Sequence, residues 1–294
     1  MLIERKIAQK VSRLSMLIIA KEKAGCKRPG SGRRNPKMVF YFTATGNSLY
    51  VAKELDEHRI SIAQAVHDTA KVYHADRIGI VYPVFGCEMP ELVREFLAES
   101  RFDANYFFII LTYGNCRGKA AELAEAYAEQ SGIHPDYINA VRMADNFLPG
   151  FDMEEQRQLD KKVDEQLFHI KTDIAGNKKY IVPSTERDRA MHREFLSRLE
   201  TKEFQEFYEI TEDCIGCGIC TKVCPKKCFH LEGQKSVWDP RPCIRCMACI
   251  HACPMLAIRL KIPEKNPRAR YRNENISICE IIAANNQWTE ADGG

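Results

Sequence analysis

The sequence predicts an α/β fold in two parts: a five-stranded parallel sheet covered by helices, and a small α+β unit rich in cysteine. Two observations predict it. Apolar runs of strand length alternate with helical segments through the first half of the 294 residues, and eight of the 13 cysteines fall in two regular runs near the C-terminal end. Alternating strands and helices are typical of a parallel sheet, and clustered thiols at short fixed spacing are typical of a metal site.

The strand predictions rest on apolar runs bounded by Gly-containing loops. Each strong run is followed by such a loop and then by a helical segment. Three strong runs lie at 38–42, 77–82 and 106–111, and two weaker ones at 60–63 and 137–143.

Five segments are predicted along the chain. Charged residues with spaced apolar positions, interrupted by Gly176 and Pro183, indicate helices between the sheet and the cysteines. The predicted segments are a basic N-terminal extension (1–37), the sheet domain (38–175), a helical connector (176–204), the cysteine domain (205–262) and a C-terminal tail, part helix and part disordered (263–294).

The N-terminal extension is strongly basic. Residues 1–37 hold 11 Lys/Arg and two Glu, although the whole chain has a net charge of only +3. The extension is open to three interpretations: a disordered segment, an upstream stretch not translated if the protein starts at Met38, or an amphipathic basic helix that touches anionic lipid or a partner. Its apolar stretch at 16–20 is too short for a signal peptide, so we expect a cytoplasmic protein.

Composition excludes two classes of protein. The chain is 45% hydrophobic and 28% charged, and no run of 18 apolar residues exists to span a membrane. Residues 38–175 hold 13 basic and 22 acidic side chains, which disfavours nucleic acid as a partner and favours a basic electron-transfer protein. The identity of a redox partner and the oligomeric state do not follow from the sequence.

The cysteine domain is an internal repeat. The run that starts at Cys214 and the run that starts at Cys243 are offset by 29 residues, and each ends in Cys-Pro. The pattern C-x2-C-x2-C-x3-C-P is that of bacterial ferredoxins, in which the fourth cysteine of a run ligates the other cluster. A pair of four-cysteine zinc sites is the alternative, but zinc modules usually separate two C-x2-C pairs by a longer loop.

The chain resembles two-cluster bacterial ferredoxins in this region. That resemblance implies two [4Fe-4S] clusters, the first held by Cys214, Cys217, Cys220 and Cys253, and the second by Cys243, Cys246, Cys249 and Cys224. Cys228 lies near the second set but matches Ala257 in the repeat, so we expect a small buried side chain rather than a ninth ligand.

A hydroxyl-rich loop follows the first predicted strand and precedes a helix. Such a turn can hold a phosphate with side-chain oxygens, turn N–H groups and the positive helix end. The loop lacks Lys and G-K-[ST], which excludes a triphosphate site of Walker type and favours a monophosphate. Its residues are Thr43, Ala44, Thr45, Gly46, Asn47 and Ser48.

This loop resembles the T-x-T-G-N-[ST] phosphate loop of the flavodoxin family, and the resemblance covers residues 38–175. It implies a strand order of 2-1-3-4-5 and an FMN at the carboxyl ends of the strands. Two later loops are those in which flavodoxins hold the isoalloxazine ring, with Phe85 and Tyr113 as stacking groups or as ordinary packing residues. The loop residues expected to touch FMN are Pro83, Val84, Phe85, Gly86, Thr112, Tyr113, Gly114, Asn115 and Gly118.

Cys87 and Cys116 lie in these same two loops. No base and no C-x-x-C pair accompanies either residue, so the sequence predicts two loop thiols without a catalytic role.

A flavodoxin-like domain followed by two clusters resembles the fused flavodoxin-ferredoxin proteins found mainly in anaerobic bacteria. The resemblance implies an iron-sulfur flavoprotein that passes electrons between FMN, the clusters and a partner redox enzyme. Two alternatives are an FMN-dependent reductase of a small substrate, and a cluster-only ferredoxin whose first domain docks a partner without flavin. No catalytic residue is predicted, because the flavin loops lack a His/Asp or Lys constellation.

Overall fold

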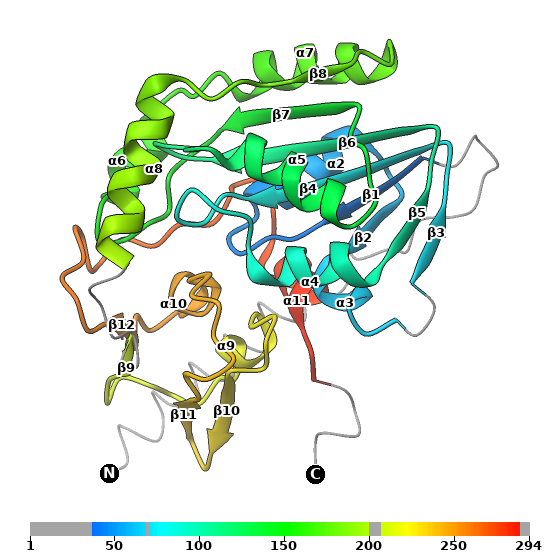
Figure 1. Ribbon diagram of the computed structural model, residues 1–294. Helices are drawn as coiled ribbons and strands as arrows, with labels where there is room; N and C mark the ends of the chain where they lie inside the picture. The colour runs from blue at the N-terminus through cyan, green and yellow to red at the C-terminus, as the bar shows by residue number, and fades with distance from the viewer. Residues whose placement is uncertain (1–36, 69–70, 200–206, 289–294) are drawn as a thin grey trace.

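A computed structural model describes residues 37–68, 71–199 and 207–288 (Figure 1). The predicted N-terminal extension up to residue 36 lies outside these residues, and its three interpretations stay predictions. Within the described ranges, no helix combines the length and the apolar character needed to cross a membrane.

The sheet has six parallel strands, one more than predicted. The additional strand, β8, lies in the stretch predicted to be a helical connector and pairs with Tyr137 and Ile138. At two residues, it is too short to show a periodic pattern in the sequence. The order across the sheet is β2 (Arg59–Ser61), β1 (Lys37–Tyr41), β4 (Arg77–Pro83), β6 (Tyr106–Tyr113), β7 (Tyr137–Arg142) and β8 (Tyr180–Ile181).

Helices cover both faces of this sheet, because successive side chains of the central strands alternate between two apolar cores. Val39 and Tyr41 belong to one core, and Phe40 and Phe42 to the other. The first core includes α2 (Asn47–Leu55) and α7 (Val163–Ala175); the second includes α3 (Ile62–Ala65), α4 (Glu91–Glu99) and α5 (Ala120–Gln130). A separate parallel pair, β3 (Val72–His74) and β5 (Arg101–Asp103), lies outside the main sheet.

The register of the central strands places two loops side by side. Strands β4 and β6 pair from Arg77 with Tyr106 to Pro83 with Thr112, so both end at the same edge of the sheet. Helix α8 (Glu186–Leu199) lies beside this edge (Figure 1), and α6 (Met153–Gln158) precedes α7.

The cysteine region forms two short antiparallel strand pairs and two short helices. Their bounds are β9 (Tyr208–Ile210) with β12 (Ile258–Leu260), β10 (Phe229–Glu232) with β11 (Lys235–Trp238), α9 (Ile219–Lys222) and α10 (Ala248–Ala252).

The repeat of 29 residues is visible in the backbone of this region. Left-handed residues occur at matching positions of the two halves, and each half begins its helix directly after one of them. The matching pairs are Gly216 and Arg245, Gly218 and Met247, and Lys227 and Leu256. The two halves therefore turn the chain in the same way around their cysteines.

After the cysteine region, the chain returns to the sheet domain. Helix α11 (Ile278–Asn285) lies between the two parts (Figure 1), and Ser277 and Glu280 form a capping box at its start. The Nδ2 of Asn285 donates hydrogen bonds to the carbonyl oxygens of Thr43 (2.9 Å) and Val223 (3.3 Å). One side chain thus joins the loop after β1 to the end of α9.

Candidate iron-sulfur centres and neighbouring loops

The cysteines of the second predicted cluster surround one cavity. Its walls include Cys224 from the first run and three cysteines of the second run, with Tyr208 and Phe229 as apolar cover. Cys224 therefore lies with Cys243, Cys246 and Cys249 rather than with its own run. Cys228 also lines the cavity, so five thiols meet there. This grouping has the chemistry of a cluster site, although the assignment of each ligand stays a prediction.

The four cysteines of the first predicted cluster, Cys214, Cys217, Cys220 and Cys253, are neighbours of one another. Burial, together with the charges of Cys217, Cys253 and Cys214, raises the pKa of Cys220 to about 11. Cys253, the last cysteine of the second run, thus lies near the first three of the other run. Thiols with a raised pKa hold their protons at neutral pH, and bound iron would displace those protons.

Backbone N–H groups point at the cysteine sulfurs in both halves. The N–H of Cys228 donates to Cys224 Sγ at 3.2 Å, and the N–H of Ala257, 29 residues later, donates to Cys253 Sγ at 3.3 Å. Such hydrogen bonds stabilise negative charge on cluster thiolates and tune their reduction potential.

Cys228 does more than fill space, which sequence reasoning missed. It is 1% exposed, and its single S–H is shared among the sulfurs of Cys224 and Cys243 and the carbonyl oxygen of Lys226, which lies 3.7 Å from Cys228 Sγ. This hydrogen bond is the main reason why the pKa of Cys243 is lowered to about 7, against the effect of burial. The second half has no thiol counterpart, because the residue that matches Cys228 there is Ala257.

The phosphate loop predicted for FMN is covered by the chain itself. Asn47 Oδ1 accepts hydrogen bonds from the hydroxyl of Tyr271 (2.8 Å) and from Asn273 Nδ2 (3.1 Å). A Cβ placed on Gly46 would lie 3.0 Å from the Cβ atoms of Asn273 and Ile276.

The other polar side chains of this loop also have partners within the chain. Asn146 Nδ2 donates to Thr45 Oγ1 at 2.7 Å, and Ser48 Oγ lies 2.7 Å from Thr112 Oγ1. Thr43 Oγ1 accepts from the N–H of Gly46. As arranged here, these side chains do not fit a bound phosphate, since the tail lies where the phosphate was expected.

The two predicted ring-binding loops come together at the edge of the sheet, but side chains fill the space around them. Phe85 packs edge-on against Phe42, with ring centroids 6.0 Å apart. A Cβ on Gly86 would meet the ring of Phe195 in α8, and one on Gly114 would meet Asp145. Tyr113 is partly buried. Phe85 therefore serves packing in this arrangement.

The same edge brings two cysteines together. Cys87 Sγ and Cys116 Sγ are 3.8 Å apart, although the residues are 29 positions apart in the chain. The sequence placed them in neighbouring loops but did not indicate that they meet, because the contact depends on the register between β4 and β6.

The second cluster site faces the sheet domain. Ile244 and Cys246 pack against the same apolar core as Val84 and Phe85 from the loop after β4. Lys226, two residues after Cys224, forms an ion pair of 3.1 Å with Glu95 in α4.

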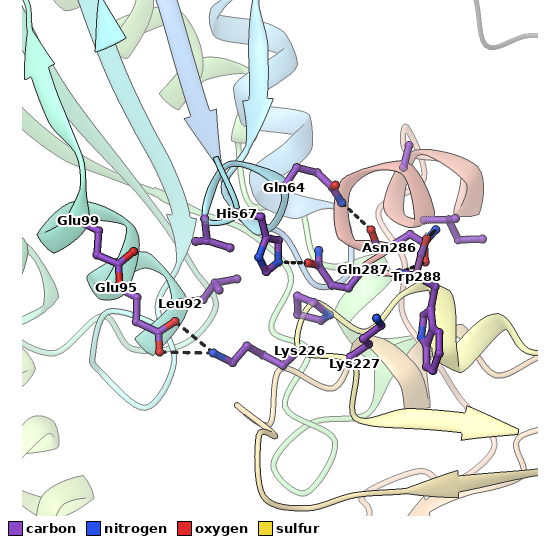
Figure 2. Close-up of a pocket in the computed structure, with 14 residues that line it drawn as sticks. Gln64, His67, Leu92, Glu95, Glu99, Lys226, Lys227, Asn286, Gln287 and Trp288 are labelled. Atoms are coloured by element: carbon purple, nitrogen blue, oxygen red, sulfur yellow. Dashed lines mark hydrogen bonds and ion pairs between the residues drawn. The ribbon is translucent and has the colours of Figure 1, made fainter. Parts of the chain in front are cut away.

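A larger cavity of about 880 Å³ lies beside this junction (Figure 2). Its walls come from α3, α4, the turn after Cys224 and the end of α11, and Lys227 lies over the ring of Trp288 at 4.6 Å. Gln64 Nε2 donates to the carbonyl oxygen of Asn286 at 2.8 Å. No residue of the predicted flavin loops lines this cavity.

Known proteins are similar to this chain mainly in the cysteine region. A family model described as a 4Fe-4S dicluster domain matches residues 207–254. A 7Fe ferredoxin from Hydrogenibacillus schlegelii is 48% identical over 54 residues, which cover 17% of this chain and 68% of that protein. A ferredoxin-like protein in the nif region of Sinorhizobium fredii is 36% identical over 55 residues, covering 17% of this chain and 86% of that protein.

A solved structure of a candidate flavoprotein from Bacteroides uniformis matches 43% of this chain and 97% of its own, with 16% identity and a TM-score of 0.27. A score this low establishes no common fold. The ferredoxin matches, in contrast, coincide with both cysteine runs and with the grouped thiols. Through its cysteine region, this chain belongs to the ferredoxin family.

Proposed function

We propose that the protein is an electron carrier that holds two [4Fe-4S] clusters and exchanges electrons with a separate redox enzyme. The observation that carries the proposal is the grouping of the cysteines: Cys224 lies with the second run, and Cys253 lies near the first. When bound, each cluster supplies a site that takes up or releases one electron.

The chain's own residues would hold the clusters and set their surroundings. Ile250 and Val223 are fully buried in the apolar core that also contains Cys220, Cys224 and Cys249. The N–H groups of Cys228 and Ala257 would stabilise charge on the cluster sulfurs. The second site faces the sheet domain, whereas the first has an exposed apolar edge.

That exposed edge is where we place the partner enzyme. Ile215 (40% exposed), Leu231 (43%) and Met255 (37%) surround the first cysteine group in the sequence, and Leu231 lies 3.6 Å from the Cβ position of Gly218. Exposed large apolar side chains mark a docking surface where they form a patch, and we propose that these three belong to one. The excess of acidic residues lies in 38–175, outside this edge, and favours a basic partner for the sheet domain.

A second candidate function is the flavin relay, in which FMN at the β1–α2 loop joins a two-electron reaction to the clusters. The sequence of residues 43–48, between a strand and a helix, favours it. FMN binding requires Asn273 and Ile276 to move away from Gly46.

One preparation tests both functions. The full chain is reconstituted with iron and sulfide without oxygen, supplied with FMN, and analysed for iron and for flavin released on denaturation. About eight irons per chain with reversible one-electron reduction is the expected result for the carrier. Zinc in place of iron, or no reversible reduction, would contradict the electron carrier. One FMN bound per chain would support the flavin relay as well.

A further inference from the structure

The pairing of two central strands of the sheet places Cys87 and Cys116 next to each other. Each follows a central strand, and the pairing of Pro83 with Thr112 aligns the ends of these two strands. The backbone of Cys87 has φ +66°, a conformation that residues with a side chain adopt only rarely. In this conformation, its sulfur lies 3.8 Å from that of Cys116.

The loops leave room for the two sulfurs. A Cβ on Gly118 would lie 2.5 Å from Cys87 Cβ and 2.8 Å from Cys87 Sγ, so only glycine admits the thiol there. A disulfide needs an S–S distance of about 2.05 Å. Both cysteines lie in loops, where a change of side-chain torsion closes such a gap most easily.

The two thiols differ in the way that disulfide exchange requires. Cys87 is 8% exposed, and burial, followed by the neighbouring Cys116, raises its pKa to about 12. Cys116 is more exposed, and its sulfur accepts a hydrogen bond from the N–H of Gly118 at 3.2 Å. Cys116 is therefore the attacking thiol and Cys87 the buried one that resolves the intermediate.

Helix α8 covers the pair. The ring of Phe195 lies against Gly86, and Nε2 of His192, 6% exposed, is 3.1 Å from Glu88 Oε1. Arg117, directly after Cys116, bonds the carbonyl oxygen of Pro183 at 2.7 Å and Asp188 at 3.4 Å. A small molecule reaches Cys116 beside this helix more readily than a folded protein does.

We propose that Cys87 and Cys116 form a redox-active dithiol/disulfide pair that exchanges two electrons with a low-molecular-weight disulfide. The proposal goes beyond electron transfer by the clusters and does not depend on them. It adds a two-electron site to the sheet domain, at the place where sequence resemblance expected the flavin ring.

The reaction balances in two steps. The Cys116 thiolate attacks one sulfur of the small disulfide and breaks its S–S bond, which releases one thiolate that takes up the proton lost by Cys116. Cys87 then attacks the Cys116 sulfur, releases the second small thiolate and passes its proton to it. The protein loses two electrons and two protons in forming the Cys87–Cys116 bond, and the small disulfide becomes two thiols.

The test uses the full, cluster-loaded protein in anaerobic glutathione buffers of graded oxidised-to-reduced ratio. After acid quench and alkylation, mass spectrometry measures the peptide that links residues 87 and 116. We expect this peptide to rise with the ratio along one two-electron transition in the wild type and in Cys279→Ser, a control in α11. Iron per chain, measured on the same samples, reports the clusters separately.

Two conservative variants identify the roles. Cys87→Ser should accumulate glutathione on Cys116, because the resolving thiol is gone, whereas Cys116→Ser should leave Cys87 without glutathione. If both thiols of the wild type stay alkylatable at every ratio while the iron content is intact, the pair is not redox-active. Equal trapping at both positions would overturn the assigned roles.

Discussion

The backbone N–H of Asn273 donates a hydrogen bond to the carbonyl oxygen of Thr45 at 2.9 Å, across more than 220 residues of sequence. Beside it, His251 in α10 accepts from the N–H of Tyr271 (3.0 Å) and contacts the carbonyl oxygen of Asn146 (2.9 Å). The tail therefore joins the loop after β1 to the cysteine region. This connection should affect FMN binding, the cluster sites and the free energy of unfolding.

If FMN binds at residues 43–48, the tail competes with it. The variant Asn273→Gly/Ile276→Gly should bind FMN more tightly than the wild type, because it removes the two Cβ atoms that lie against Gly46 and the Asn273 amide that bonds Asn47 Oδ1. Fluorescence quenching of FMN measures the affinity, with Asn275→Ala, at an exposed position in the same turn, as control. Equal FMN binding by all three proteins would mean that FMN does not bind at residues 43–48.

Paired cysteine substitutions test the exchange of ligands between the two runs. Cys217→Ser/Cys253→Ser changes two ligands of one predicted cluster and should leave about four irons per chain. Cys217→Ser/Cys224→Ser changes the same number of cysteines, both in the first run, and should disturb both clusters. Iron analysis of the two variants gives the comparison, and an inverse result would show that each run holds its own cluster.

Replacing Cys228 should change the potential of one cluster only. The Cys228→Ala variant loses the single S–H that is shared among Cys224, Cys243 and the carbonyl oxygen of Lys226, and a hydrogen bond to a cluster sulfur favours the more negative, reduced cluster. The potential of that cluster should fall by about 40 mV for each hydrogen bond worth about 1 kcal/mol. A redox titration followed by electron paramagnetic resonance measures it, and the other cluster is the internal control.

Replacing Asn285 should lower the free energy of unfolding. It is fully buried, and its Nδ2 satisfies two carbonyl groups in different parts of the protein. Asn285→Ala leaves both groups unpaired, so we expect a loss of about 1–3 kcal/mol in the free energy of unfolding. Denaturant unfolding of the cluster-loaded protein measures it, and an effect no larger than that of Asn275→Ala would contradict this role.

Opening the cover over the thiol pair should expose Cys87. Phe195→Ala removes the ring that lies against Gly86, so alkylation of Cys87 should become faster, while Phe168→Ala in α7, at a side chain already 67% exposed, should leave it unchanged. Timed alkylation with peptide mapping measures both rates. The same rate in the two variants would mean that α8 does not protect this thiol.

Local patterns predicted much of what the structure contains. Apolar runs such as 77–82 and 106–111 became central strands, because a buried parallel strand needs continuous apolar residues. The cysteine runs were visible because their spacing is set by the cluster rather than by the fold.

What the sequence did not predict depends on contacts between distant segments. Strand β8 has only two residues, and it forms because the edge of β7 offers free backbone groups to Tyr180 and Ile181. The return of the tail over Gly46 is carried by Tyr271, Asn273 and Ile276, which have no periodic pattern. The meeting of Cys87 with Cys116 follows only from the register of two strands.

The path of the chain through α11 has a mechanical consequence. The cysteine region is anchored to the sheet domain at several points, through Lys226, Asn285 and the residues that follow Tyr271. A ferredoxin module tethered by a single linker can swing between donor and acceptor, but one held on both sides cannot. If the chain carries electrons as proposed above, its donor and acceptor have to come to it, because the cysteine region stays at a fixed distance from the Cys87–Cys116 pair.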